Sequence, residues 1–271
     1  MTRKYLRKVE LSLGAGGLEL DEQMMIAFDV QKTISGIPNN GIVSVWNLSR
    51  SSQEKIGKEW DTLELKAGYH GIGTGIILKG DIREVYHDPQ GVDTISEIVV
   101  GDGDKADRTG FIAKTFPRGT EVKDIVEEIY KNMPGVSRGE WKGLDDLPKT
   151  TRPMTFMSPT RKALDLIGKT YDLYHSIQNE ALEIIPKDDA IQQVALISPE
   201  TGMIGAPTIT DTGVRVKTLL DADIRPNRLV EVKSKTTELN GAGKRYRVGS
   251  VAFYGDTMDG DFDAEVEGEK I

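Results

Sequence analysis

The sequence has no cysteine, and its three histidines lie far apart at His70, His87 and His175. Without cysteine there is no disulfide and no thiolate zinc site. The histidines lack the His-Glu-x-x-His spacing of metalloproteases, and Ser158 and Ser198 each precede a proline outside any Gly-x-Ser-x-Gly elbow. We therefore predict that the chain is not an enzyme and uses no metal or cofactor.

Long hydrophobic runs and an excess of positive charge are also missing. The longest apolar stretches, at residues 42–48 and 76–78, are far shorter than the ~20 residues that a membrane-spanning helix needs. Residues 1–5 are basic but no apolar segment follows, so we predict neither export nor membrane insertion. The net charge of −8 argues against tight binding to nucleic acid or to an anionic membrane surface.

The first third of the chain, residues 1–102, has the alternating pattern of β-strands. Residues 9–13 and 24–30 place apolar side chains on every second position. Further strands are predicted at 42–48, 63–67, 75–85 and 93–100, with a short helix after Ser49. About six strands with short connections are typical of a small barrel or sandwich.

The middle part, residues 103–188, changes to a helical period. One helix is predicted from a Thr120 cap to Pro134-Gly135, and a second opens at Ser158-Pro159. Residues 136–151 are polar and predicted to be a loop. Residues 171–177 and 181–185 are predicted to form a hairpin, which makes this part a small α/β module.

Strand character returns in residues 189–271. Strands are predicted at 194–197, 213–219, 229–233 and 246–254, with turns that include residues 240–243. Acidic residues then occupy alternate positions at the end of the chain: Asp259, Asp261, Asp263, Glu265 and Glu267. No exact repeat is visible, but the two β-rich ends are predicted to be distant versions of one unit.

Three patterns that resemble ligand sites have simpler explanations. Residues 71–75 are glycine-rich but lack the Gly-x-Gly-x-x-Gly spacing and precede a strand, which favours a β-turn. Asp102, Asp104 and Asp107 begin like a calcium loop, yet its glycine and its final carboxylate are absent, so we predict a solvated turn between domains. No pair among the 43 acidic residues stands out as a glycosidase pair.

Several motifs occur in a characteristic order along the chain. Asn47-Leu48-Ser49 closes an apolar strand, and residues 198–207 contain Pro199 and Gly202. Leu219-Leu220-Asp221 leads to an Arg-Pro-Asn-Arg turn at Pro226, and the closing segment carries Gly255-Asp256 with an aromatic at Phe262. Together these resemble the baseplate hub family (tail hub, or late control protein D type) of tailed bacteriophages and phage-like contractile particles.

This resemblance implies a fold that is mainly β, with two tube-type β-barrel domains flanking a small helix-containing module. It implies a structural virion protein of the tail baseplate, assembled in the host cytoplasm. Three copies would form a ring that joins the sixfold tail tube to the threefold central spike. The implied partners are the chain itself as a homotrimer, the tail tube protein, the central spike protein and other baseplate proteins, with DNA only as passing cargo.

Two questions stay open at this level. Three chains would carry 24 negative charges, three times the −8 of one chain, so the acidic residues 259–267 either line a DNA channel or keep the surface soluble. A neighbouring tube-type protein, such as a distal tail or tube initiator protein, is an alternative to the hub. A peptidoglycan hydrolase or wall-binding module is a further alternative, without a residue that supports it.

Overall fold

The computed structural model describes residues 6–234 and 245–271, and its elements follow the three predicted parts. The first part contains β1 (Arg7–Leu13), β2 (Leu18–Asp21), β3 (Ile26–Thr33), β4 (Asn40–Trp46), α1 (Arg50–Lys55), β5 (Thr62–Tyr69), β6 (Gly73–Gln90) and β7 (Asp93–Gly101). The middle part contains α2 (Asp104–Thr109), β8 (Phe111–Phe116), α3 (Val122–Lys131), β9 (Ser137–Trp141), β10 (Met154–Pro159), α4 (Thr160–Tyr171), β11 (Leu173–Gln178) and β12 (Ala181–Pro186). The last part contains β13 (Ile191–Ile197), β14 (Met203–Ile209), β15 (Gly213–Leu219), β16 (Arg228–Val232), β17 (Arg245–Asp256) and β18 (Phe262–Glu269).

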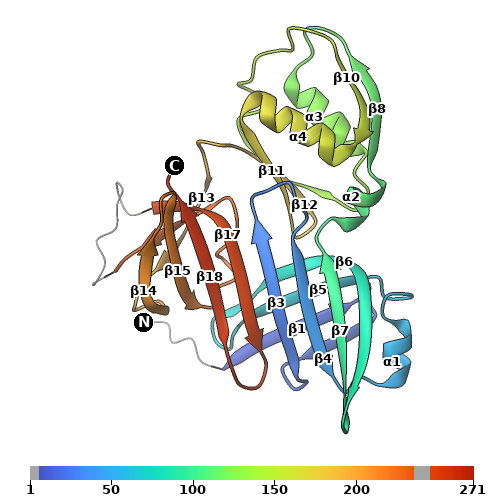
Figure 1. Cartoon of the computed structure of the whole chain (residues 1–271), viewed down its shortest axis with the longest axis vertical. Coiled ribbons are helices and arrows are strands. Elements are labelled where there is room, and N and C mark those ends of the chain that lie inside the picture. Colours follow the sequence, from blue (N-terminus) through green and yellow to red (C-terminus); the bar gives the residue numbers. More distant parts are fainter. Residues whose placement is uncertain (1–5, 235–244) are drawn as a thin grey trace.

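One sheet of thirteen strands runs through both ends of the chain. Its order is β14-β15-β18-β17-β3-β4-β7-β6-β5-β1-β2, and β16 pairs with β17 and carries β13. In Figure 1, β1 and β5 cross behind β3 and β4, so the sheet bends back over its own core. The mainly β class with an α/β middle is confirmed, although the described strands close neither end into a separate barrel. The division at residues 102 and 188 stays a prediction.

The alternating pattern explains the core of this sheet. Val9, Leu11 and Leu13 share the inner face of β1 and are fully buried, as their spacing predicts. The same hydrophobic cluster also contains Val251 and Phe253 of β17, so both ends of the chain contribute to one core. Separating the ends would expose apolar surface on each, at a cost of roughly 25 cal/mol per Å².

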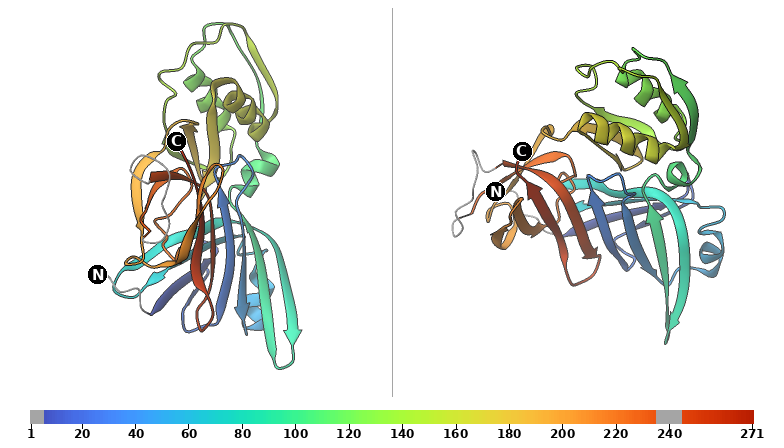
Figure 2. Two further views of the ribbon diagram at one scale, coloured as in Figure 1. Left: turned by 60° about the vertical axis from the view of Figure 1, so that its left-hand side comes forward. Right: turned by 45° about the horizontal axis from the view of Figure 1, so that its top comes forward.

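The middle module packs around a core of its own. Helix α3 buries the residues at its predicted helical spacing, Val122, Ile125, Val126 and Ile129. Helix α4 contacts α3, the β8–β10 pair and β11, which belongs to a three-stranded sheet in the order β11-β12-β9. Figure 2 shows the module at one end of the large sheet, opposite the tip of the β6–β7 hairpin.

Some local predictions in this module are wrong. Helix α3 begins after Glu121, because the Thr120 hydroxyl donates to the carbonyl of Pro117 (2.7 Å) instead of capping the helix. Helix α4 begins after Pro159 and has no side-chain cap, so Ser158 does not cap it. The predicted loop at residues 136–151 contains β9, which is held by parallel pairing with β12 and has no local pattern of its own. The turn predicted at residues 240–243 lies outside the described residues.

The two ends of the chain repeat one strand order. The first end runs β3-β4-β7-β6-β5-β1, and the last end runs β14-β15-β18-β17-β16-β13. The hairpins match as well, with β3–β4 equivalent to β14–β15 and β6–β7 equivalent to β17–β18. The prediction of two distant versions of one unit is therefore confirmed for strand order. The outermost pair differs, because β1 is antiparallel to β5 whereas β13 is parallel to β16.

The repeat extends to the register of the strands. The β4–β7 ladder has seven paired positions, and so has the β15–β18 ladder. A bulge shifts the β6–β7 ladder between Ile82 and Glu84, and another shifts the β17–β18 ladder between Val248 and Ser250. Superposing the ladders makes these bulges coincide, so each β6 residue from Glu84 onward matches the β17 residue 166 positions later. Because a bulge is a specific local feature, its repetition indicates one unit used twice.

Candidate assembly surface

Strands β17 and β3 join the two ends of the chain. They pair antiparallel, from Ser250 opposite Thr33 to Asp256 opposite Ala27. Arg7 of β1 adds a clasp, because its Nη1 donates to the carbonyl of Asp256 at 2.9 Å and its guanidinium lies 5.2 Å from the centre of the Phe262 ring. The flat guanidinium can donate and stack at once. The first strand is thereby tied to the last hairpin.

The closing motif has clear structural roles at this joint. A Cβ atom on Gly255 would lie 2.7 Å from atoms of both Phe28 and Phe262, so only glycine fits between the rings. The Asp256 carboxylate accepts from the two backbone N–H groups of residues 258 and 259, at 2.8 and 2.7 Å. These bonds fix the turn between β17 and β18. The motif thus shapes the hairpin that contacts β3.

The other family-like positions shape turns and do not gather at one site. They are Asn47, Leu48 and Ser49 between β4 and α1, Pro199 and Gly202 between β13 and β14, and Pro226 before β16. Asn47 has a φ of 56° and Gly202 a φ of 112°, in regions that favour these residue types. The Ser49 hydroxyl caps α1 by accepting the Ser52 N–H at 3.2 Å.

The five acids near the end of the chain do not form one uniform face. Asp263 is buried and pairs with Lys217 at 2.9 Å, and Glu267 accepts from Nε of Arg215 at 3.0 Å. The acids with exposed side chains are Asp259, Asp261, Glu265 and Glu267. Arg215 and Lys217 alternate on the neighbouring strand β15, so basic groups offset part of this negative charge.

A buried polar cluster fastens the middle module to the first end. The prediction of a solvated turn at Asp102, Asp104 and Asp107 is wrong, because Asp102 is fully buried and Asp104 nearly so. Asp102 accepts the backbone N–H groups of Asn179 and Glu180, each at 2.6 Å, in the tight turn between β11 and β12. One carboxylate thus anchors the whole hairpin to the end of β7.

Lys32 and Asn39 complete this cluster. Lys32 is buried and its ammonium contacts Oδ1 of Asn179, while Nδ2 of Asn39 donates to the carbonyl of Ile177 at 2.7 Å. Burial lowers the pKa of Lys32 to about 8 and raises the pKa of Asp102 to about 6, and the opposite charges of the two groups work against both shifts. Such a buried pair is stable only while every member keeps its partners.

Replacing Asp102 with asparagine tests this burial through the pH dependence of stability. A pKa raised to about 6 from 3.8 means that the folded chain binds this proton more tightly than the unfolded chain. The stabilisation is complete below about pH 4 and is lost as the pH rises through about 6. Relative to Asp102→Asn, the free energy of unfolding of the native chain should fall by on the order of 2 kcal/mol over that range, measured by urea titration. A constant difference between the two proteins would contradict the buried carboxyl group.

A second buried cluster fastens the module to the last end of the chain. Glu183 of β12 is buried and accepts from Nη1 of Arg228 at 3.0 Å and from Nδ2 of Asn227 at 3.0 Å. Arg247 of β17, also buried, donates to the carbonyl of Lys187 at 2.6 Å. The module is therefore held by both ends, and its position on the sheet is set by buried charged groups.

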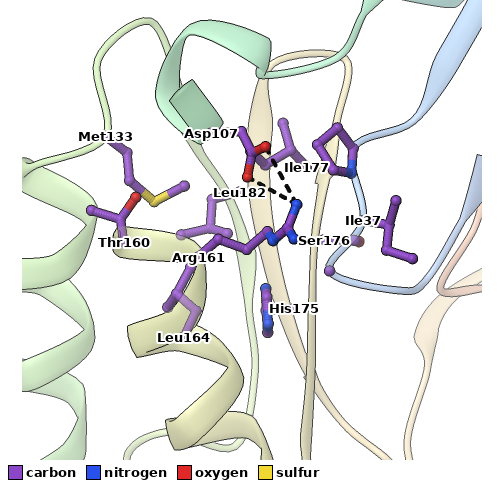
Figure 3. Close-up of a pocket in the computed structure, with 12 residues that line it drawn as sticks. Ile37, Asp107, Met133, Thr160, Arg161, Leu164, His175, Ser176, Ile177 and Leu182 are labelled. Atoms are coloured by element: carbon purple, nitrogen blue, oxygen red, sulfur yellow. Dashed lines mark hydrogen bonds and ion pairs between the residues drawn. The ribbon is translucent and has the colours of Figure 1, made fainter. Parts of the chain in front are cut away.

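A small pocket lies between the β3–β4 connection and α4 (Figure 3). Nη1 of Arg161 lies 3.0 Å from Oδ1 of Asp107 beside it, and Nε2 of His175 lies 2.9 Å from Oδ1 of Asp165. Burial lowers the pKa of His175, and Asp165 opposes that shift. The interior offers about 20 Å³ to the centres of water-sized molecules, which suits a water molecule and no cofactor.

Reactive groups stay scattered over the described chain. Within residues 6–234 and 245–271, no three His, Asp or Glu side chains are grouped to hold a metal ion. The spacing Gly-x-Ser-x-Gly does occur at residues 135–139, but Ser137 begins β9 and its hydroxyl donates to the carbonyl of Glu180 at 2.9 Å. This is not the strand-to-helix elbow of a nucleophilic serine. In the part of the chain that the structure describes, no helix has the length and apolar character to cross a membrane.

Solved structures with this arrangement are tail proteins. The 43 kDa tail protein of prophage MuSo2 from Shewanella oneidensis is similar over 96% of both chains, with a TM-score of 0.65 and 10% identity. The tail protein from Neisseria meningitidis MC58 is similar over 98% of this chain and 97% of its own, with a TM-score of 0.64 and 10% identity. The fold thus belongs to the class of phage tail proteins.

The E. coli c3393 protein extends this class to the type VI secretion system, of which it is a component. It is described as structurally similar to the T4 bacteriophage tail proteins gp27 and gp5, and it matches over 94% of this chain and 75% of its own. Its TM-score is 0.66 at 11% identity. At such identities these comparisons show a shared fold.

The family model of the baseplate hub gp41 matches residues 6–268, so the chain belongs to the baseplate hub gp41 family. The resemblance seen in the sequence motifs is thereby confirmed. No curated protein matches the sequence significantly. The family and the structural neighbours are structural proteins of tails and baseplates rather than enzymes, as predicted, and the chain is a component of a virion tail.

Proposed function

We propose that three copies of this chain form a closed ring, the hub that joins the sixfold tail tube to the threefold central spike. The repeated unit is the observation that carries this proposal, because each chain contains two units with the same strand order and register. Three chains then present six similar units to the tube, while the true symmetry of the ring remains threefold for the spike. The partners are the tail tube protein, the central spike protein and other baseplate proteins, and assembly takes place in the host cytoplasm.

Such a ring would let DNA pass as cargo without binding it. Its 24 negative charges, three times the −8 of one chain, oppose the counterion release that drives DNA binding. Glu265 and Glu267 point outward from β18 beside the joint with β3, which supports a place in the channel wall. Arg215 offsets part of this charge, so the wall would be mildly rather than strongly acidic.

The paired units favour the hub over its alternatives. A distal tail or tube initiator protein with one unit per chain would need six copies to match a sixfold tube, whereas this chain supplies two units. A peptidoglycan hydrolase would need a grouped set of catalytic side chains, and the described residues offer none that is better placed than the pairs above. The hub therefore accounts for more of the fold.

Light scattering on the purified chain, alone and with its spike protein, tests the proposal. We expect an assembly of about three times 29.9 kDa for the hub component. An assembly of six chains would support a tube-type neighbour instead. A chain that stays monomeric at millimolar concentration and also with the spike protein would contradict the ring.

A further inference from the structure

The joint between β17 and β3 has a counterpart that is left open within one chain. Strand β14 is equivalent to β3, and residues 84–90 of β6 are equivalent to the part of β17 that pairs with β3. Among the described residues, β14 pairs only with β15, and residues 84–90 pair only with β7. We propose that β14 of one copy pairs antiparallel with residues 84–90 of a neighbouring copy. This inference rests on the ring proposed as the function, and it names the surface that closes the ring.

The repeat also gives the register of this contact. In the internal joint Asp29 lies opposite Tyr254. The matched ladders make Thr208 equivalent to Asp29 and Asp88 equivalent to Tyr254, so Thr208 should lie opposite Asp88 of the neighbouring copy. The rung of Ile26 in the internal joint is a hydrogen-bonded one (3.0 Å), so the rung of Asp29, three positions on, is not. Side chains lie closest on such non-hydrogen-bonded rungs.

Burial supports the missing neighbour. Ile209 is equivalent to Val30, yet Val30 is fully buried whereas Ile209 is 40% exposed. The opposing strand shows the same contrast, because Phe253 is buried and its equivalent His87 is exposed. Thr210 donates its backbone N–H to β15 at 3.0 Å, so strand alternation points the N–H and C=O of Ile209 toward the open side. An apolar side chain and a pair of backbone groups thus await a partner strand.

The irregular positions of the two edges coincide. Pro89 is equivalent to Gly255, whose backbone faces β3, so Pro89 lacks a donor on the open side. The register of β14 shifts between Ile204 and Thr208, and in the proposed alignment this shift lies opposite Pro89. The missing donor therefore falls where the partner strand bulges away, and the rung of Ile209 and His87 beyond it keeps its full set of backbone groups.

The outward faces carry opposite charges. Residues 84–90 present Glu84 and Asp88 on the outer face, while β15, next to β14, presents Arg215 and Lys217. Attraction across the contact favours this pairing over a contact between like edges. The two strands are different surfaces of the same chain, so the contact is head-to-tail and generates a ring when it closes. It would also cover strand edges that otherwise promote aggregation.

Disulfide trapping tests this pairing, and the absence of native cysteine makes the background clean. The double variant Thr208→Cys/Asp88→Cys places thiols opposite each other on a close rung, within the reach of a disulfide. Under mild oxidation we expect covalent species of two and three chains on a non-reducing gel, with nothing larger, and their loss on reduction. Each single variant should give no three-chain species.

The matched control is Thr208→Cys/His87→Cys, which moves one thiol to the other face of the sheet. It should give at least roughly tenfold less cross-linked product. A three-chain assembly by light scattering in which Thr208→Cys/Asp88→Cys cross-links no better than this control would overturn the pairing and leave the ring. A ladder that continues beyond three chains would overturn closure through these edges. The absence of assembly in all variants and in the native chain, also with the spike protein, would contradict the ring itself.

Discussion

Asp102→Ala is expected to destabilise the folded chain by about 3–5 kcal/mol, because it removes one partner of a buried charged pair. The substitution leaves Lys32 buried without its counter-charge and leaves the N–H groups of Asn179 and Glu180 without their acceptor. Equilibrium unfolding in guanidinium chloride at pH 7, followed by tryptophan fluorescence, measures this loss.

Asp107→Ala is the matched control for Asp102→Ala. Asp107 is only partly buried and pairs with Arg161 at 3.0 Å, so its removal should cost less than about 1 kcal/mol. Equal losses for the two variants would contradict the account of Asp102 as the anchor of the middle module. The double variant Lys32→Met/Asp102→Asn should recover part of the loss, since no unpaired charge then remains.

Phe262→Ala should destabilise the chain by a similar amount, about 3–5 kcal/mol, because it opens a cavity in the core shared by both ends. The Phe262 side chain is 3% exposed and meets the rings of Phe28 and Tyr69 edge-on, at centroid distances of 5.8 and 5.5 Å. It also supports the Arg7 guanidinium at 5.2 Å. Thermal and chemical unfolding should both report the loss.

Phe111→Ala provides the comparison of the same size and chemistry. Phe111 lies on β8 and is 50% exposed, so truncating it should change the free energy of unfolding by less than about 1 kcal/mol. If both phenylalanine variants were equally stable, the joint between β3 and β17 would not contain the tightly packed core described here.

Local patterns predicted many of the elements. The alternation at residues 213–219 matches β15 at both ends, and the helical spacing after Thr120 predicted α3 to within a few residues. Turn residues also placed the β11–β12 hairpin, where Asn179 and Glu180 both adopt positive φ. Each of these features depends on neighbours in the sequence, which is why the residues alone could indicate them.

Long-range pairing was beyond such patterns. The β17–β3 joint connects residues more than 200 positions apart, and alternation identifies a strand without identifying its partner. The burial of Asp102 depends on N–H groups 77 and 78 residues further along the chain. Strand β14 was not predicted, because glycine and proline at residues 205–207 interrupt its pattern. Its short apolar ends, Met203-Ile204 and Thr208-Ile209, were the available signal.

Electron microscopy of the cross-linked three-chain species, viewed along its axis, tests the central claim most directly. The claim is that each chain contributes two equivalent units to one ring. Averaged images of particles containing three chains should show six similar lobes around a central opening. Three lobes, or a compact particle without an opening, would contradict the use of the two ends as equivalent units.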